Sequence, residues 1–228
     1  MHEDLSRFRA RTRGFSSDSL PPPPAPLTTA PGLTAKVGPA GELLPFAGDT
    51  VVFPLPARAK AAAACLQDLL HHRCGGLLAQ RLPPDSLHLT LHDLNSGPAG
   101  ASLTARMDAA RPQAEEILSK LREEPPIPMR STWVFSMAST SVVLGLEPRD
   151  DAACLRLMDL YDRFQSVVPL GYPLTPHITL AYYRPGVYGQ EELHPLRGAL
   201  TAAAWGAVEL ELEPRLLRYH RFADMRDF

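Results

Sequence analysis

The sequence predicts a mixed α/β fold built from two similar halves. From Gly48 onward, the apolar residues switch repeatedly between the period of a strand and that of a helix. A His-Leu-Thr-Leu motif at residues 88–91 is matched by His-Ile-Thr-Leu at residues 177–180, each on an alternating strand that follows a proline-bearing loop and precedes a helix. An internal duplication of this kind would bring the two strands together about a pseudo-twofold axis. The two motifs are therefore expected to lie face to face.

The N-terminal part of the chain has a different composition. Ser, Thr, Gly and Pro dominate residues 16–45, with four consecutive prolines at 21–24, and such a segment buries too little apolar surface to offset its ordering entropy. We expect residues 1–45 to form a flexible Pro-rich arm and residues 46–228 to form one domain with two pseudo-symmetric lobes. The arm is either a mobile leader without chemistry or a strap that lies across the folded body.

The remaining elements follow from the periodicity. Strands are expected at 50–56, 86–94, 126–138, 141–147, 174–183 and twice after Gly206, with a break at Pro214. Helices are expected at 57–73, 102–123, 150–167 and 189–203, the second of them with Ser102 as its N-cap.

Composition excludes several classes of function. No apolar run approaches the roughly 18 residues of a membrane-spanning helix, which excludes an integral membrane protein. A net charge of -2 gives no general attraction to polyanions, so long DNA or RNA is not an expected partner and a nucleic-acid substrate would be short or terminal. The three cysteines form no C-x-x-C motif, and the N-terminus shows no signal-peptide stretch. We therefore expect a cytoplasmic protein without a disulfide scaffold or a zinc ribbon.

The two motifs carry residues suited to phosphoryl chemistry. Residues i and i+2 of a strand share a face, so His88 lies beside Thr90, and His177 beside Thr179, while the intervening leucine and isoleucine pack behind. One neutral imidazole can take a proton from the attacking water or hydroxyl, an imidazolium can protonate the leaving oxygen, and the hydroxyls can hold phosphate oxygens. Either histidine can be the acid or the base, depending on the direction in which the substrate lies.

This pair of motifs resembles the signature of the 2H (two-histidine) phosphoesterase superfamily, which includes bacterial 2'-5' RNA ligase-like proteins, cyclic nucleotide phosphodiesterases and RNA-end-trimming enzymes. In its order of elements, the resemblance covers about residues 48–222. It implies a bilobal α/β (α+β) fold, in which two antiparallel sheets face each other across a central cleft with helices outside. It also implies a reaction without metal or cofactor, with His88, Thr90, His177 and Thr179 as the catalytic residues.

Two tyrosines after the second motif are candidate substrate contacts. Tyr183 keeps the parity of His177 along a continuous strand, so it would face the cleft, whereas Tyr182 would need a bulge to do so. Some members of the resembled superfamily carry an aromatic residue at the spacing of Tyr182. Either ring could stack on a base, or both could be ordinary strand aromatics.

These residues predict a phosphoric diester hydrolase that needs no metal. The expected substrate is a small nucleotide or an RNA end that carries a 2',3'-cyclic phosphate or a 2'-5' or 3'-5' phosphodiester. The alternative is a non-catalytic module that binds nucleotides or other phosphorylated ligands in the same cleft. A zinc pair of His88 and His92 is excluded, because four residues of strand separate them by about 13 Å.

Overall fold

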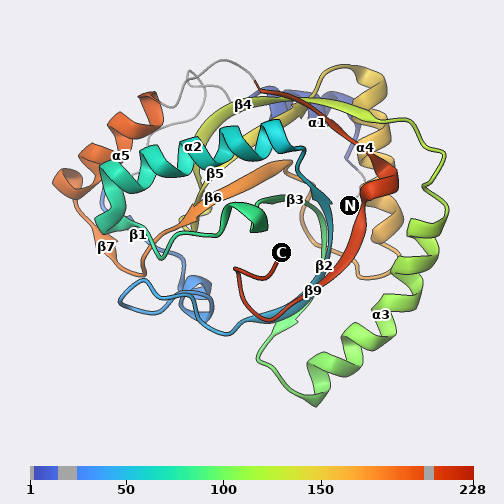
Figure 1. Cartoon of the computed structure of the whole chain (residues 1–228), viewed down its shortest axis with the longest axis horizontal. Coiled ribbons are helices and arrows are strands. Elements are labelled where there is room, and N and C mark those ends of the chain that lie inside the picture. Colours follow the sequence, from blue (N-terminus) through green and yellow to red (C-terminus); the bar gives the residue numbers. More distant parts are fainter. Residues whose placement is uncertain (1–2, 15–24, 203–207) are drawn as a thin grey trace.

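The computed structural model describes residues 3–14, 25–202 and 208–228, and one curled antiparallel sheet organises them (Figure 1). Its seven strands are ordered β8-β4-β5-β6-β3-β2-β9. Their bounds are β2 (Ala47–Pro54), β3 (His88–Gly97), β4 (Ile127–Met137), β5 (Ser141–Pro148), β6 (His177–Tyr182), β8 (Glu209–Leu212) and β9 (Arg218–Phe222). A second, two-stranded sheet pairs β1 (Leu27–Thr28) with β7 (Val187–Tyr188).

Helices surround this sheet on its outer side (Figure 1). They are α1 (Leu5–Arg13), α2 (Ala57–Cys74), α3 (Ala101–Ser119), α4 (Asp151–Phe164) and α5 (Gln190–Ala202), with short 3-10 turns η1 (Pro31–Ala35), η2 (Gly75–Leu77), η3 (Pro84–Ser86) and η4 (Pro214–Leu216). Helix α2 packs on α5 and β6, whereas α3 packs on β2, β3 and β9. In the described part of the chain, no helix is long and apolar enough to cross a membrane.

The predicted α/β fold class is confirmed, and the two halves meet at the two motifs. Strands β9, β2 and β3 form the first half of the sheet, and β6, β5, β4 and β8 form the second. They join where Leu89 of the first motif pairs with Ile178 of the second, both of them buried. The two facing sheets expected from the resemblance are therefore continuous at one edge. The apolar residue between His and Thr in one motif pairs with its counterpart in the other, and this pairing joins the two halves within the core.

Both central strands contain a bulge at the same place in the repeat. Thr90 and His92 of β3 pair with consecutive residues of β2, which leaves Leu91 as the extra residue. Thr179 and Ala181 of β6 pair in the same way with consecutive residues of β5, which leaves Leu180 as the extra residue. A bulge reverses which side chains face a given side of the sheet from that point on. The two halves thus share the bulge as well as the motif.

The described residues of the predicted arm are packed against the body. Phe8 of α1, Leu27, Leu33 and Val37 are at most 1% exposed and belong to the hydrophobic core. Helix α1 packs on α4 and β5, and β1 extends the strand pairing to the body. The run of four prolines lies outside the described residues. Of the two alternatives for the arm, the described parts match a strap that lies across the domain.

The start of α3 differs from the prediction. Gly100 is the N-cap residue, and Ser102 lies within the first turn. The chain turns at Gly97, the last residue of β3, where φ is 152°, and α3 begins at Ala101. The helix also ends at Ser119 instead of residue 123, because Leu121 turns inward and is fully buried.

Candidate active site

A cavity of about 310 Å³ lies over β3 and β6, on the side of the sheet where the two motifs present their polar residues. All four motif residues proposed from the sequence, His88, Thr90, His177 and Thr179, line it. The structure therefore brings together two imidazoles and two hydroxyls that come from opposite halves of the chain. Behind them, the alternate residues of both strands are buried in the core, which fixes the strands that carry the site.

Each histidine is oriented by a backbone carbonyl two residues before it. His88 Nδ1 lies 2.7 Å from the carbonyl oxygen of Ser86, and His177 Nδ1 lies 2.7 Å from that of Thr175. A carbonyl oxygen only accepts, so each Nδ1–H donates this bond and each Nε2 keeps its lone pair. Two imidazoles in the same tautomer thus have Nε2 available for proton transfer.

In the first motif, the histidine and the threonine are also hydrogen-bonded to each other. Thr90 Oγ1 lies 3.1 Å from His88 Nε2, and because Nδ1 already carries the proton, the hydroxyl is the donor. A rotation about the Cβ–Oγ1 bond can turn this hydroxyl hydrogen from the ring toward a phosphate oxygen. The pair of His88 and Thr90 can therefore exchange an internal bond for bonds to a substrate.

Burial controls the charge of both imidazoles. Desolvation lowers the pKa of His88 to about 4, helped by the nearby His220 and His177 and opposed by the Ser86 carbonyl and by Asp93. Desolvation also lowers the pKa of His177, against the Thr175 carbonyl and Asp93. Both rings are thus neutral at pH 7 without a ligand. An anionic ligand between them would raise the pKa of each and favour a protonated ring.

The lowered pKa of His88 predicts a pH dependence of stability. His88 titrates near 6.5 when the chain is unfolded and near 4 when it is folded, so the stability present above pH 6.5 is lost as the pH falls toward 4. We expect the free energy of unfolding to fall over this range by about 3 kcal/mol more in the wild type than in His88→Ala, at about 1.4 kcal/mol per pKa unit. Urea titrations at several pH values measure this difference, and parallel curves for the two proteins would contradict the prediction.

The bulges decide which residues beyond the motifs face the cavity. Tyr182 lines it, and so does Asp93 at the equivalent position of the first half. Tyr183 does not: its side chain is fully buried in the core. The prediction of Tyr183 as a substrate contact is corrected on this point, because the extra residue Leu180 reverses the parity on which it depended. Tyr182 remains a candidate contact.

Asp93 and Tyr172 join the two lobes across the cavity. The Tyr172 hydroxyl donates to Asp93 Oδ2 at 2.8 Å, and the Tyr161 hydroxyl donates to the Tyr172 carbonyl oxygen at 2.5 Å. Burial and the Asp93 charge raise the pKa of Tyr172, so its phenol stays protonated. No motif in the sequence indicates Tyr161 or Tyr172. The signal for Asp93 was its position in the first repeat, which is that of Tyr182 in the second.

An aromatic run covers the other wall. The Phe228 ring stacks on the His88 ring with centroids 4.1 Å apart, the Phe222 ring lies 5.0 Å from Phe228, and Phe46 lies 6.3 Å from Phe222. Phe222 and Phe228 line the cavity, and Figure 1 shows the C-terminal segment turned back toward β2 and β3. We call Phe46, Phe222 and Phe228 the aromatic run. Phe46 is far in sequence from Phe222 and Phe228, and no local pattern in the sequence indicates the three.

Helix α1 supports the second histidine. Arg11 donates to the Leu174 carbonyl oxygen at 2.6 Å and to Thr175 Oγ1 at 3.0 Å, while Glu3 neutralises its charge. The carbonyl of Thr175 is the acceptor for His177 Nδ1. Arg11 is thus a positioning residue that acts through the loop before β6.

This contact predicts an effect at a distance. Arg11→Met should lower kcat by roughly tenfold to 100-fold with little change in KM, because the His177 ring loses its fixed orientation. The matched control is Arg7→Met on the same helix, where the side chain is 81% exposed. Steady-state kinetics of the two variants test this, and equal values for Arg11→Met and the control would exclude the positioning role.

The described residues offer no ligand set for a metal. Among residues 3–14, 25–202 and 208–228, no three His, Cys, Asp or Glu side chains are grouped to hold an ion. His92 is buried against Tyr161 and Phe164, away from the cavity wall that His88 lines. The imidazoles and hydroxyls that line the cavity can transfer protons and donate hydrogen bonds.

Comparisons with known proteins bear on the fold. No protein-family model matches the chain, and no curated protein matches it by sequence. A conserved protein of unknown function from Agrobacterium tumefaciens is similar over 96% of each chain, with a TM-score of 0.63 and 21% identity. TT0787 of Thermus thermophilus covers 79% of this chain and 98% of its own, with a TM-score of 0.47 and 18% identity. LigT of E. coli, complexed with 3'-AMP, covers 78% of this chain and 98% of its own, with a TM-score of 0.44 and 14% identity. The first of these likenesses shows a shared fold.

Proposed function

We propose that the protein is a phosphodiesterase of the two-histidine kind, which hydrolyses a small nucleotide or an RNA end without a metal. The bond cleaved is that of a 2',3'-cyclic phosphate or of a 2'-5' or 3'-5' phosphodiester. One observation carries the proposal: two imidazoles in the same tautomer line one cavity, and each has a threonine hydroxyl two residues further along its strand. This is the set of groups that an in-line displacement at phosphorus requires.

In the proposed step, one histidine accepts a proton and the other donates one, so the total number of protons on the two rings is unchanged. The neutral Nε2 of one histidine takes a proton from water as the water oxygen bonds to phosphorus. The protonated Nε2 of the other gives its proton to the leaving oxygen as the P–O bond breaks. Thr90 and Thr179 donate to the non-bridging oxygens, on which negative charge develops. Because burial favours neutral rings, the anionic phosphate itself is what allows one ring to be protonated near neutral pH.

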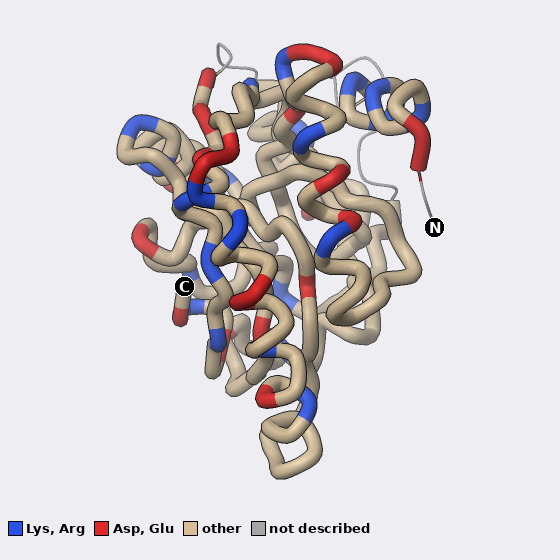
Figure 2. The backbone as a smooth tube through the Cα atoms, turned by 90° about the vertical axis from the view of Figure 1, so that its right-hand side faces the viewer, with Lys and Arg blue, Asp and Glu red and all other residues tan. Residues whose placement is uncertain are grey.

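The size of the cavity and the distribution of charge support a small substrate. A volume of about 310 Å³ is at the lower end of the range for ligand pockets, which suits one nucleotide. Tyr182 and the aromatic run offer rings on which a base can stack. On the side of the molecule drawn in Figure 2, basic and acidic residues are interspersed, so a long polyanion has no continuous basic track in this view.

Hydrolysis assays in excess EDTA test the proposal. The panel comprises 2',3'-cyclic nucleotides, 2'-5'- and 3'-5'-linked dinucleotides, and short RNAs that end in a 2',3'-cyclic phosphate. We expect turnover with at least one member and a bell-shaped dependence of kcat/KM on pH, as an acid and a base must both be in the right form. If no member is turned over while a nucleotide still raises the melting temperature, the cleft is a binding module and the hydrolase proposal is wrong.

A further inference from the structure

Lys36 lies in the cavity although it belongs to the predicted arm. It follows η1 and is held by its backbone: Lys36 N donates to the Leu33 carbonyl oxygen, and Leu44 N donates to the Lys36 carbonyl oxygen, both at 2.9 Å. Its neighbours Leu33 and Val37 are buried in the core. The side chain is therefore presented from a fixed backbone, and it lines the same cavity as the histidines.

The ammonium group of Lys36 has no ion-pair partner within the described residues. Of the residues described as lining the cavity, Lys36 is the one Lys or Arg and Asp93 the one Asp or Glu, and no ion pair between them is formed. Asp93 is instead bonded by the Tyr172 hydroxyl. The Lys36 ammonium lies over two rings, 4.8 Å from the centroid of Phe46 and 5.9 Å from that of Tyr182. Burial lowers the pKa of Lys36, and the Asp93 charge opposes this only from beyond ion-pair distance, so a closer anion would stabilise the ammonium further.

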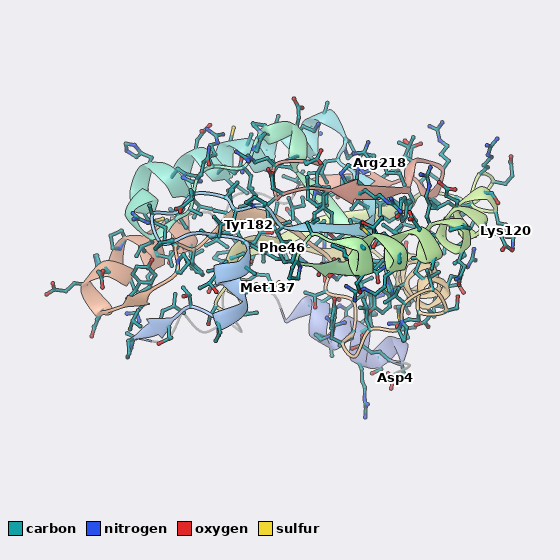
Figure 3. The ribbon with its side chains drawn as sticks, turned by 90° about the horizontal axis from the view of Figure 1, so that it is seen from below. Asp4, Phe46, Lys120, Met137, Tyr182 and Arg218 are labelled. Carbon is teal, nitrogen blue, oxygen red and sulfur yellow. The ribbon has the colours of Figure 1, made fainter. Side chains whose placement is uncertain are left out.

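The Lys36 ammonium lies on the Tyr182 side of the cavity, over the Phe46 and Tyr182 rings. His177 and Tyr182 stand at opposite ends of β6, roughly 15 Å apart at the rise of a strand. Figure 3 shows Tyr182 grouped with Phe46 and Met137. The aromatic run links the His88 ring to the Phe46 ring over which the Lys36 ammonium lies.

We infer that Lys36 binds a second phosphate of the substrate, on the 5' side of the nucleotide whose 2' or 3' phosphate is hydrolysed. This rests on the proposed function and narrows its substrate class. In a nucleotide, the 5' oxygen leaves the ribose on the side away from the 2' and 3' oxygens, so a phosphate there extends toward the Lys36 ammonium when the reacting phosphate is between the histidines. A 5'-phosphorylated nucleotide and the last nucleotide of an RNA both carry this group, whereas a nucleoside 2',3'-cyclic phosphate with a free 5' hydroxyl does not.

Paired ligands test the inference. Affinity is measured by calorimetry for adenosine 2'- and 3'-monophosphate and for the matching 2',5'- and 3',5'-bisphosphates, with wild type, Lys36→Met, Lys36→Gln and Lys36→Arg. The control is Lys120→Met, on an exposed side chain at the end of α3 (Figure 3). The wild type should bind the bisphosphates about tenfold to 100-fold more tightly, the range for a charged hydrogen bond. Lys36→Met and Lys36→Gln should abolish this preference, Lys36→Arg should keep part of it, and Lys120→Met should leave it intact.

Other results overturn the inference and separate it from the hydrolase proposal. If Lys36→Met weakens monophosphates and bisphosphates equally, Lys36 serves the reacting phosphate and the second subsite is wrong. If wild type binds both kinds equally but still hydrolyses cyclic nucleotides, the subsite is wrong and the hydrolase stands. A preference that depends on Lys36 without turnover of any substrate supports the subsite and overturns the hydrolase. Binding of neither kind overturns both.

Discussion

Replacing either motif histidine by alanine is expected to lower kcat/KM by about 10² to 10⁴, the range for removing a general acid or base. His88→Ala and His177→Ala should both show this loss, because each proton transfer belongs to the same displacement. For the same reason the double variant should be little slower than either single one, since groups that act as a unit are not additive. The loss should appear in kcat. KM should change little, because the two threonines still bind the phosphate.

The measurement is steady-state hydrolysis in EDTA of whichever substrate the panel identifies. His72→Ala is the matched control, because His72 is exposed on α2 and does not line the cavity. A large loss in one histidine variant only would contradict a two-histidine mechanism, since it would leave one proton transfer to water. Additive losses in the double variant would likewise show that the two rings act in separate steps.

The two motifs could be found from the sequence because their information is local. Alternation places His88 and Thr90 on one face and Leu89 on the other, and the repeat in the second half predicts that the two strands meet. The structure extends this with the pairing of Leu89 and Ile178. The residues that build the site and those that join the lobes are thus interleaved in one tetrapeptide, which is why a short pattern carries so much of the fold.

Residues after the bulges could not be assigned in this way. Whether Tyr182 or Tyr183 faces the cavity depends on an extra residue in β6, which is defined by its pairing with β5 and leaves no mark in the local alternation. The repeat itself held the missing information in part. Asp93 and Tyr182 are 89 residues apart, like the two motif histidines, and a charged residue at this position of the repeat favours the cavity face for both.

The arm shows a second limit of local reasoning. Its composition is typical of a disordered segment, but Leu33 and Val37 are buried in the hydrophobic core although few apolar residues surround them in the sequence. Arg11 and Lys36 reach the site from this segment, by contacts with parts of the chain far away in sequence. Composition reports the average burial of a stretch, whereas these functions depend on a few individual side chains.

Removal of the motif hydroxyls is expected to have the second-largest effect. Thr90→Val and Thr179→Val keep the shape and the β-branch of the side chain in a strand, so the fold should be retained. Each should lower kcat by about 10² or more, because a donor aimed at the developing charge on phosphate stabilises the transition state more than the bound substrate. Thr90→Ser and Thr179→Ser restore the hydroxyl and should recover most of the rate.

The two threonines should nevertheless differ in one respect. Thr90 also donates to Nε2 of His88, so Thr90→Val removes a bond that holds this ring, as well as a phosphate contact. We therefore expect Thr90→Val to lower the maximum of kcat/KM and also to shift the pH at which kcat/KM rises or falls. Thr179→Val should lower the maximum without shifting the profile along the pH axis. Full pH–rate profiles for the four variants decide this. If both valine variants raise KM and leave kcat unchanged, the hydroxyls bind the substrate and the transition state equally, and the proposed preferential stabilisation of charge at phosphorus is wrong.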